Sequence, residues 1–156
     1  MLLLRVNSLR PARLCAALLV LSGCATARPG SEALHFPVIN YTTLEGVRFA
    51  VYLQGEKDSR QCSESAANVA RSIGSTCPAC AVTHFCTTGP DDAHRRILSR
   101  GSLDTPSLRT ADGKVTMTVE ARDRSAAENA CRQIERQSSS QLPQSGLRCY
   151  PSGSPR

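Results

Sequence analysis

An internal repeat places the strongest limit on what this chain can fold into. The segments 47–53 and 115–121 both alternate apolar and polar residues, which is the period of a half-buried β-strand. A turn signal and a further extended segment precede each of them, within 38–46 and 107–114. The pair Asp112-Gly113 is a strong signal for a tight turn. Each copy therefore predicts a β-hairpin.

An amphipathic helix is predicted after each hairpin. Apolar residues recur at i, i+3, i+4 and i+7 in the segments 66–73 and 127–134, which forms a single apolar stripe on a helix. The two segments, AANVARSI and AENACRQI, match at Ala, Asn, Arg and Ile. Asp58 and Asp123 offer N-caps, and Gly74 offers a stop for the first helix.

A last strand follows each helix, over 81–86 and 146–150, so each copy is hairpin, helix, strand. One helix cannot cover the apolar face of its own hairpin, and we therefore expect the two copies to share a core. The predicted fold is α+β, with two ββαβ pseudo-repeats forming a mixed, mostly antiparallel sheet and both helices on one face. Two independent small domains are the alternative.

The domain organisation follows from the repeat and from the composition of its flanks. A single α+β domain is predicted over 37–150, as repeat 1 (37–86), a linker (87–106) and repeat 2 (107–150). The pattern leaves open whether the linker holds a short strand or a helical turn. Small and polar residues, with Pro and Gly, predict a flexible tether over 24–36 and a disordered tail over 151–156.

Cysteines are expected to compensate for a thin core. The 156 residues include no Trp, three Phe, three Tyr and eight Cys. With Cys15 and Cys24 set aside, an even count of six allows three disulfides in 15 possible arrangements. A strand that returns after a helix ends beside the start of that helix. This geometry predicts the pairs Cys131–Cys149 and Cys62–Cys86, and it leaves Cys77–Cys80 to close a small loop.

A second interpretation of the same cysteines is a thiol or metal site. Cys77, Cys80, His84 and Cys86 form a C-x2-C-x3-H-x-C cluster, and three thiolates with an imidazole suit tetrahedral zinc. The CPAC tetrad also resembles a thioredoxin-type redox motif. A redox CxxC normally opens a helix, whereas Pro78 and the following AVTHF indicate a loop that leads into a strand. Structural disulfides are therefore our first interpretation.

The N-terminus has the features of a secretory signal. Arg5, Arg10 and Arg13 occur without any acidic residue over 1–23, and the apolar stretch 14–21 is far shorter than the roughly 20 residues that span a bilayer. Such a segment is removed from the mature protein. We expect residues 1–23 to be this signal peptide.

The signal ends in Leu21-Ser22-Gly23-Cys24, which resembles the lipobox of bacterial lipoproteins. The resemblance implies that the Cys24 thiol is diacylated, that the chain is cut before Cys24, and that the new amino group is acylated. Three acyl chains exceed what stable anchoring requires. Position 25 is Ala rather than the Asp that resembles an inner-membrane retention signal. The expected location is the outer membrane.

Charge and motif content bear on the function class. The formal net charge of +6 falls to +3 once the three arginines of the signal leave, with 16 Lys and Arg against 13 Asp and Glu. Nucleic-acid binding therefore has little support.

None of the three histidines is a strong candidate for catalysis. His35 falls in the tether, and His84 is predicted to pack in the sheet. His94 is predicted to lie in a solvated turn, although Asp91-Asp92 before it could orient it as a base. No hydrolase, zincin, P-loop or dinucleotide motif occurs.

These observations predict a non-enzymatic lipoprotein without a cofactor. We expect it to be held to the membrane by its lipid and to bind another envelope protein or peptidoglycan, as an accessory of secretion, conjugation or envelope assembly. The doubled strand–helix–strand order is similar in predicted topology alone to the SPOR peptidoglycan-binding fold. One alternative is a periplasmic thiol or metal protein using the CPAC cluster. Another is an inhibitor of a lysozyme or protease that presents the segment 87–106 as a rigid loop.

Overall fold

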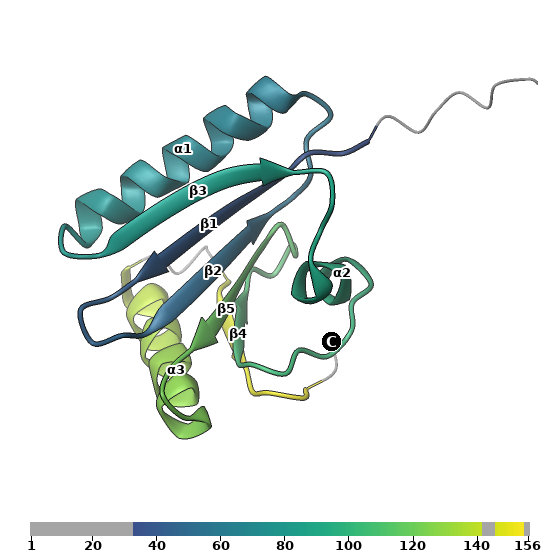
Figure 1. The fold of residues 1–156 in the computed structure, drawn as a ribbon. Helices are drawn as coiled ribbons and strands as arrows, with labels where there is room; N and C mark the ends of the chain where they lie inside the picture. Colours follow the sequence, from purple (N-terminus) through teal and green to yellow (C-terminus); the bar gives the residue numbers. More distant parts are fainter. Residues whose placement is uncertain (1–32, 142–145, 155–156) are drawn as a thin grey trace, which may run out of the picture. The chain divides into compact units, whose positions relative to one another are not determined.

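The two predicted ββαβ units are present in the protein. A computed structural model describes residues 33–141 and 146–154 (Figure 1). Its elements are β1 (Phe36–Thr42), β2 (Arg48–Leu53), α1 (Ser59–Thr76), β3 (Ala81–Thr87), α2 (Asp92–Leu98), β4 (Ser107–Arg109), β5 (Val115–Glu120), α3 (Arg124–Gln141) and β6 (Arg148–Tyr150). The α+β class is confirmed. The signal peptide and Cys24 lie outside the described residues.

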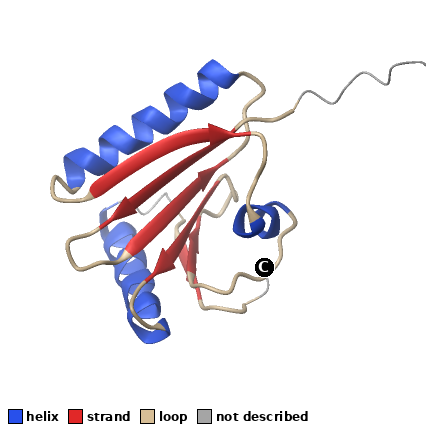
Figure 2. Cartoon of the chain, viewed as in Figure 1, coloured by secondary structure: helices blue, strands red, loops and turns tan. Residues whose placement is uncertain are grey.

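The six strands form one sheet in the order β3-β1-β2-β5-β4-β6 (Figure 2). All five pairings between the described strands are antiparallel, so the expected mixed sheet is instead an antiparallel one. In each unit the first strand lies between the other two, because the helix carries the chain over the hairpin to its far side. The units join where β2 pairs with β5, at the centre of the sheet.

Both long helices pack on the same face of the sheet, as the repeat predicted. Ile39 of β1 and Val51 of β2 are buried with Ala70 of α1. Phe49 of β2 is buried with Ala127 and other residues of the second unit. Small residues on both helices allow close approach to the sheet, which suits a core that lacks Trp.

The segment between the units is not a simple linker. Residues 92–98 form α2, which lies against the opposite face of the sheet (Figure 1). Ile97 of α2 and Leu103 of the following loop are buried against Val38 and Tyr52. The question that the sequence left open is therefore resolved in favour of a helix, and this helix contributes a second, smaller core.

The helix starts agree with the predicted caps. The Asp58 carboxylate accepts the Arg60 N–H at 2.7 Å, and the Asp123 carboxylate accepts the Ala126 N–H at 2.8 Å. The predicted stop at Gly74 is wrong, because α1 continues to Thr76. Gly74 does not adopt a positive φ, and the helix instead ends at Cys77, whose N–H bonds to the Ile73 carbonyl at 2.7 Å.

Hydrogen bonds hold residues at both ends of the described domain. The ordered sheet begins within the segment assigned to the tether, since β1 starts at Phe36 and His35 pairs with Glu56. At the other end, Gly153 donates its N–H to the Leu103 carbonyl at 2.8 Å. This bond holds the described part of the tail against the loop that follows α2.

Three disulfides join the six described cysteines in the pairs that the topology predicted. Cys62–Cys86 ties the start of α1 to the end of β3, and Cys131–Cys149 ties α3 to β6. Cys77–Cys80 closes the turn between α1 and β3. Cys62 and Cys131 are fully buried, so two of the bridges are part of the core as well as crosslinks.

Candidate functional site

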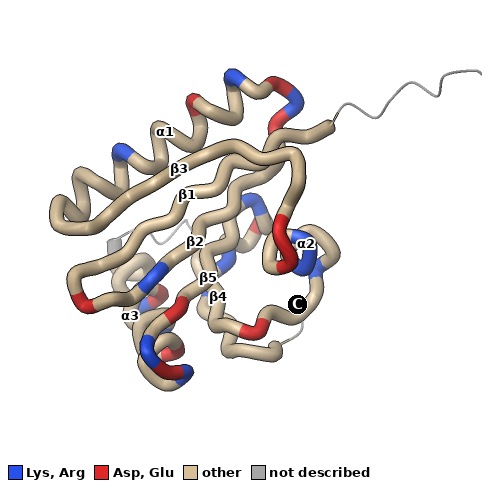
Figure 3. Tube along the Cα trace, in the orientation of Figure 1, with Lys and Arg blue, Asp and Glu red and all other residues tan. Residues whose placement is uncertain are grey.

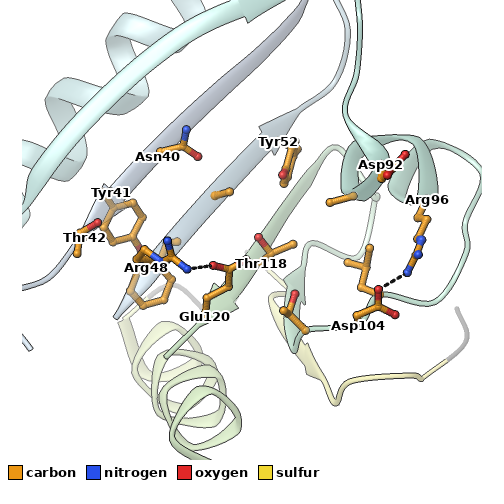
Figure 4. A pocket seen from close by; sticks show the side chains of 15 residues that line it. Asn40, Tyr41, Thr42, Arg48, Tyr52, Asp92, Arg96, Asp104, Thr118 and Glu120 are labelled. Carbon is orange, nitrogen blue, oxygen red and sulfur yellow. Dashed lines mark hydrogen bonds and ion pairs between the residues drawn. The ribbon is translucent and has the colours of Figure 1, made fainter. Parts of the chain in front are cut away.

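The candidate site is a groove on the open face of the sheet, the face that α1 and α3 do not cover. It has a volume of about 630 Å³ and lies between the sheet and α2 (Figure 4). We call it the open-face groove. Its floor comes from β1, β2 and β5: Asn40, Thr42, Ala50, Tyr52 and Thr118. Its rim comes from the sheet, α2 and the loop after α2: Arg48, Glu120, Asp92, Arg96 and Asp104.

The groove exists because α2 is short and the floor side chains are small. With seven residues, α2 covers Val38 and Tyr52 but leaves the neighbouring part of the face uncovered. At the centre of that part, Ala50 stands directly opposite Thr118. Both side chains are short, and they leave a hollow above the strands although Thr118 itself is 5% exposed.

Two exposed ion pairs line the rim. Arg48 Nη2 lies 2.7 Å from Glu120 Oε2 on the sheet side, and Arg96 Nη1 lies 2.6 Å from Asp104 Oδ2 on the α2 side (Figure 4). Acidic and basic residues are interspersed along the trace here rather than separated into patches (Figure 3). Exposed pairs contribute only about 0–1 kcal/mol, so a charged ligand can replace one partner at little cost.

The floor offers neutral hydrogen-bonding groups. Among the described residues, the side-chain amide of Asn40 and the hydroxyl of Thr42 have no protein partner, so both can bond a ligand. Burial, together with the nearby charges of Asp91 and Glu120, raises the pKa of Tyr52 to about 12. The Tyr52 hydroxyl therefore stays protonated at neutral pH, and a hydrogen bond to the Asp91 carboxylate favours the same form.

His94 holds α2 to the sheet, and its position corrects the expectation of a solvated turn. The residue is 1% exposed. Its ring lies 4.7 Å from the Phe36 ring and 4.9 Å from the Tyr52 ring, measured between centroids. Burial lowers the pKa of His94 below 6.5, and the charge of Asp91 opposes that shift. His94 Nδ1 is buried without a hydrogen-bond partner, so the ring acts as an apolar anchor.

Asp91 caps the start of α2. Its carboxylate accepts the His94 N–H at 2.7 Å, which makes it the N-cap of α2. The same carboxylate was a candidate for orienting a catalytic imidazole. The His94 ring packs against the rings of Phe36 and Tyr52 and is not among the residues that line the open-face groove. The Asp–His pair therefore stabilises the wall of the groove.

The CPAC cluster is divided by the disulfides. Cys86 bonds to Cys62 of α1, and Cys77 bonds to Cys80, so its three sulfurs are not available as thiolates for zinc. Within the described ranges, no group of three or more His, Cys, Asp and Glu residues has the arrangement of a metal site. His84 is exposed on β3, not packed in the sheet as expected, because β3 is an edge strand.

The Cys77–Cys80 bridge lies at the wrong end of a helix for a reactive thiol pair. Cys77 is the C-cap of α1, where the negative end of the helix dipole disfavours a thiolate. The segment 87–106 is packed along much of its length. It buries His94, Ile97 and Leu103 against the sheet instead of projecting as a free loop.

Comparison with protein-family models, with curated proteins and with solved structures finds no match for this chain. Within residues 33–141 and 146–154, none of the helices combines the length and the apolar character needed to cross a membrane. The groove is therefore interpreted from its own geometry.

Sequence reasoning did not find the open-face groove, although part of its signal was present. The alternation in 47–53 and 115–121 places Arg48, Thr118 and Glu120 on the face opposite the apolar one. Opposite charges that alternate onto one face of two neighbouring strands suggest a cross-strand pair. What the pattern could not show is that β2 and β5 are neighbours, or that α2 forms a wall beside them.

Proposed function

We propose that this protein is a lipid-anchored accessory of the outer membrane that binds another envelope protein through the open-face groove. The lipobox-like Leu21-Ser22-Gly23-Cys24 supports the anchor, and the three disulfides suit a domain that functions outside the reducing cytosol. The binding function rests on the groove.

The chemistry of the rim and the floor is the observation that carries this proposal. A polypeptide segment presents charged side chains and backbone amides together. The pairs Arg48–Glu120 and Arg96–Asp104 can exchange partners with such charges. Asn40 and Thr42 can bond its amides. Uncharged sugar rings would leave both ion pairs unused, so the rim favours a polypeptide segment over a glycan chain.

An accessory role fits the groove better than catalysis does. No histidine or cysteine is among the fifteen residues that line it, so it lacks the thiol and imidazole that a nucleophile–base pair most often uses. The carboxylates of its rim are exposed and engaged in ion pairs. These side chains are suited to recognition at neutral pH.

Affinity capture from solubilised membranes tests the proposal. The full-length protein carries a C-terminal tag, and the variant Arg96→Glu is compared with Arg60→Glu. The second change is a matched control, because Arg60 is also a helical arginine beside a carboxylate but lies on α1, outside the groove. We expect a specific partner that is retained by the control variant and lost from Arg96→Glu.

Two results would contradict the proposal. One is equal capture by both variants, which would place binding elsewhere on the molecule. The other is sedimentation of the protein with purified peptidoglycan, in an amount that Arg96→Glu reduces and Arg60→Glu does not. That result would assign the groove to the glycan or its peptides instead of to an envelope protein.

A further inference from the structure

The two edges of the sheet are protected to very different degrees. At one edge, β6 is three residues long, begins with the charged Arg148 and is followed by Pro151. At the other edge, β3 is seven residues long and pairs with β1 in continuous register without a bulge (Figure 2). Its sequence, AVTHFCT, contains no Lys, Arg, Asp, Glu or Pro. Short length, a bulge, charged residues and proline, which prevent an edge from pairing in other sheets, are therefore all missing from β3.

Disulfides hold the β3 edge at both of its ends. Cys86, next to the last residue of β3, is bonded to Cys62 of α1. Cys80, immediately before β3, is bonded to Cys77. An edge strand has only one neighbour to hold it, and the two bridges add constraints that limit fraying. A strand that is already rigid loses less entropy when another strand pairs with it.

The outward side chains of β3 are compatible with pairing. Phe85 is 47% exposed, the largest exposed aromatic surface among the described residues. Thr83 is exposed too, and it shares a face of the strand with Phe85 because side chains alternate along a strand. Thr and Phe are favourable residues for cross-strand contacts. In antiparallel pairing of β3 with itself, no Lys, Arg, Asp or Glu side chains would oppose each other.

We propose that β3 pairs with β3 of a second copy of this chain and extends the sheet across two molecules. Full overlap of the seven residues places His84 opposite His84 of the second copy, and Phe85 opposite its Thr83. The two-fold axis that relates the two strands then passes between the two His84 residues. This arrangement repeats, between molecules, the antiparallel two-fold pairing that β2 and β5 make inside the sheet.

The size of the contact indicates where the dimer forms. One pair of seven-residue edges is smaller than the roughly 800 Å² per partner of a standard stable interface. Copies confined to a membrane surface meet at a much higher effective concentration than copies in dilute solution. We therefore expect the pairing on membranes, and this step rests on the proposed lipid anchor.

Site-specific photo-crosslinking in membranes tests the pairing. Benzoyl-phenylalanine replaces Phe85 in the full-length protein, and in the control it replaces Leu44, which is 83% exposed in the turn between β1 and β2. Illumination should give a product of twice the mass of the chain from position 85 and not from position 44. A product of any other mass, a dimer of equal yield from both positions, or no dimer from position 85 would overturn the proposal.

A charge at the edge provides a second test. The variant Phe85→Lys places a charged residue on β3, as is common on natural edge strands. In the proposed dimer, the lysines of the two copies would also lie close together near the two-fold axis. With benzoyl-phenylalanine moved to position 83, the dimer should form in the wild-type background and in Leu44→Lys, and be lost from Phe85→Lys. Persistence of the dimer in Phe85→Lys would contradict the proposed register.

Failure of the anchor can be distinguished from failure of the pairing. The same samples are separated into membrane and soluble fractions before the gel. A protein found only in the soluble fraction would refute the anchor. In that case the crosslink is repeated on the purified chain at high concentration, where the edge must still give a dimer from position 85 if it pairs with itself.

Discussion

Ala50 of β2 and Thr118 of β5 lie directly opposite each other, and each holds the same position within its own ββαβ unit. The register around them is symmetric, since Arg48 faces Glu120 while Tyr52 faces Thr116. A pseudo-two-fold axis therefore passes between Ala50 and Thr118. The axis runs through the floor of the open-face groove, which explains why both units contribute to that floor.

The disulfides do not follow this symmetry. In the aligned helices, Cys131 of α3 matches Ala70 of α1. Ala70 packs in an apolar cluster together with Val82 of β3, whereas Cys131 is bonded to Cys149 of β6. At this matched position, apolar packing holds α1 to its unit, whereas a disulfide holds α3 to its unit.

This difference predicts how stability depends on the bridges. Removing the second bridge with Cys131→Ala and Cys149→Ala should lower the free energy of unfolding by about 2–5 kcal/mol. Removing Cys77 and Cys80 in the same way should cost less, because that bridge spans a sequence separation of 3 instead of 18. Urea denaturation of the two variants measures both costs. Equal losses would show that loop closure does not set the contribution of these bridges.

The sequence was sufficient to predict the elements that show a clear hydrophobic period, and the disulfides that follow from the order of those elements along the chain. Alternation located β2 and β5, and the i, i+3, i+4, i+7 spacing located α1 and α3. The pairs Cys62–Cys86 and Cys131–Cys149 followed, because a strand that returns from a helix must end beside the start of that helix. These inferences depend only on contacts within one unit.

Features that depend on contacts between units were not predictable in the same way. The short helix α2 has too few residues for a periodic signal, and its role depends on burial of Ile97 against Tyr52. His94 follows two aspartates, which is typical of a solvated helix start, yet the helix turns its ring toward Phe36. The groove is formed by the β2–β5 junction together with α2. A sequence pattern within one unit predicts neither of these contacts, so it could not predict the groove.

The core around the second unit gives a direct stability prediction. Leu108 of β4 is fully buried beside Val119 and Ala127. Leu108→Ala should cost about 2–5 kcal/mol of unfolding free energy, because it leaves a cavity in a closely packed site. Leu44→Ala is the matched control, since the same change at a residue 83% exposed should have little effect. Chemical denaturation that gives similar midpoints for the two variants would contradict this description of the core.

The proposed lipid anchor predicts the behaviour of a single substitution. Cys24→Ala removes the thiol that the lipobox-like motif would acylate, and it should release the protein from membranes. Fractionation of cells followed by an alkaline wash measures the release. Retention of the variant in the washed membranes, at the level of the unchanged protein, would refute anchoring through Cys24.

The oxidation state of the cysteines separates a structural role from a redox role. Protein trapped in cells with an alkylating agent should contain no free thiols among the six described cysteines. If instead a fraction of the molecules carries alkyl groups on Cys77 and Cys80 alone, that bridge cycles in the cell. Peptide mapping by mass spectrometry identifies the alkylated positions, and such a result would revive the thiol-redox interpretation.

The buried imidazole of His94 predicts a loss of stability in mildly acidic solution. Burial lowers its pKa below 6.5 in the folded protein, whereas the unfolded chain protonates near 6.5. Below that pH the unfolded state therefore binds more protons, so the free energy of unfolding falls as the pH falls toward the folded pKa. Asp112 and Asp123 do not contribute in this window. Hydrogen bonds lower their pKa values below 3.8, and the stability they add is lost only in more acidic solution.

The variant His94→Phe isolates this effect. A phenyl ring keeps the packing against Phe36 and Tyr52, removes the titration, and removes the unpaired Nδ1. Its urea midpoint should change less than that of the unchanged protein between pH 7 and about pH 5, the range in which an imidazole gains its charge. His84→Phe is the control, because it makes the same replacement at an exposed imidazole on β3. If His94→Phe and the unchanged protein lose stability in parallel as the pH falls, the acid sensitivity does not arise from the ring that holds α2 to the sheet.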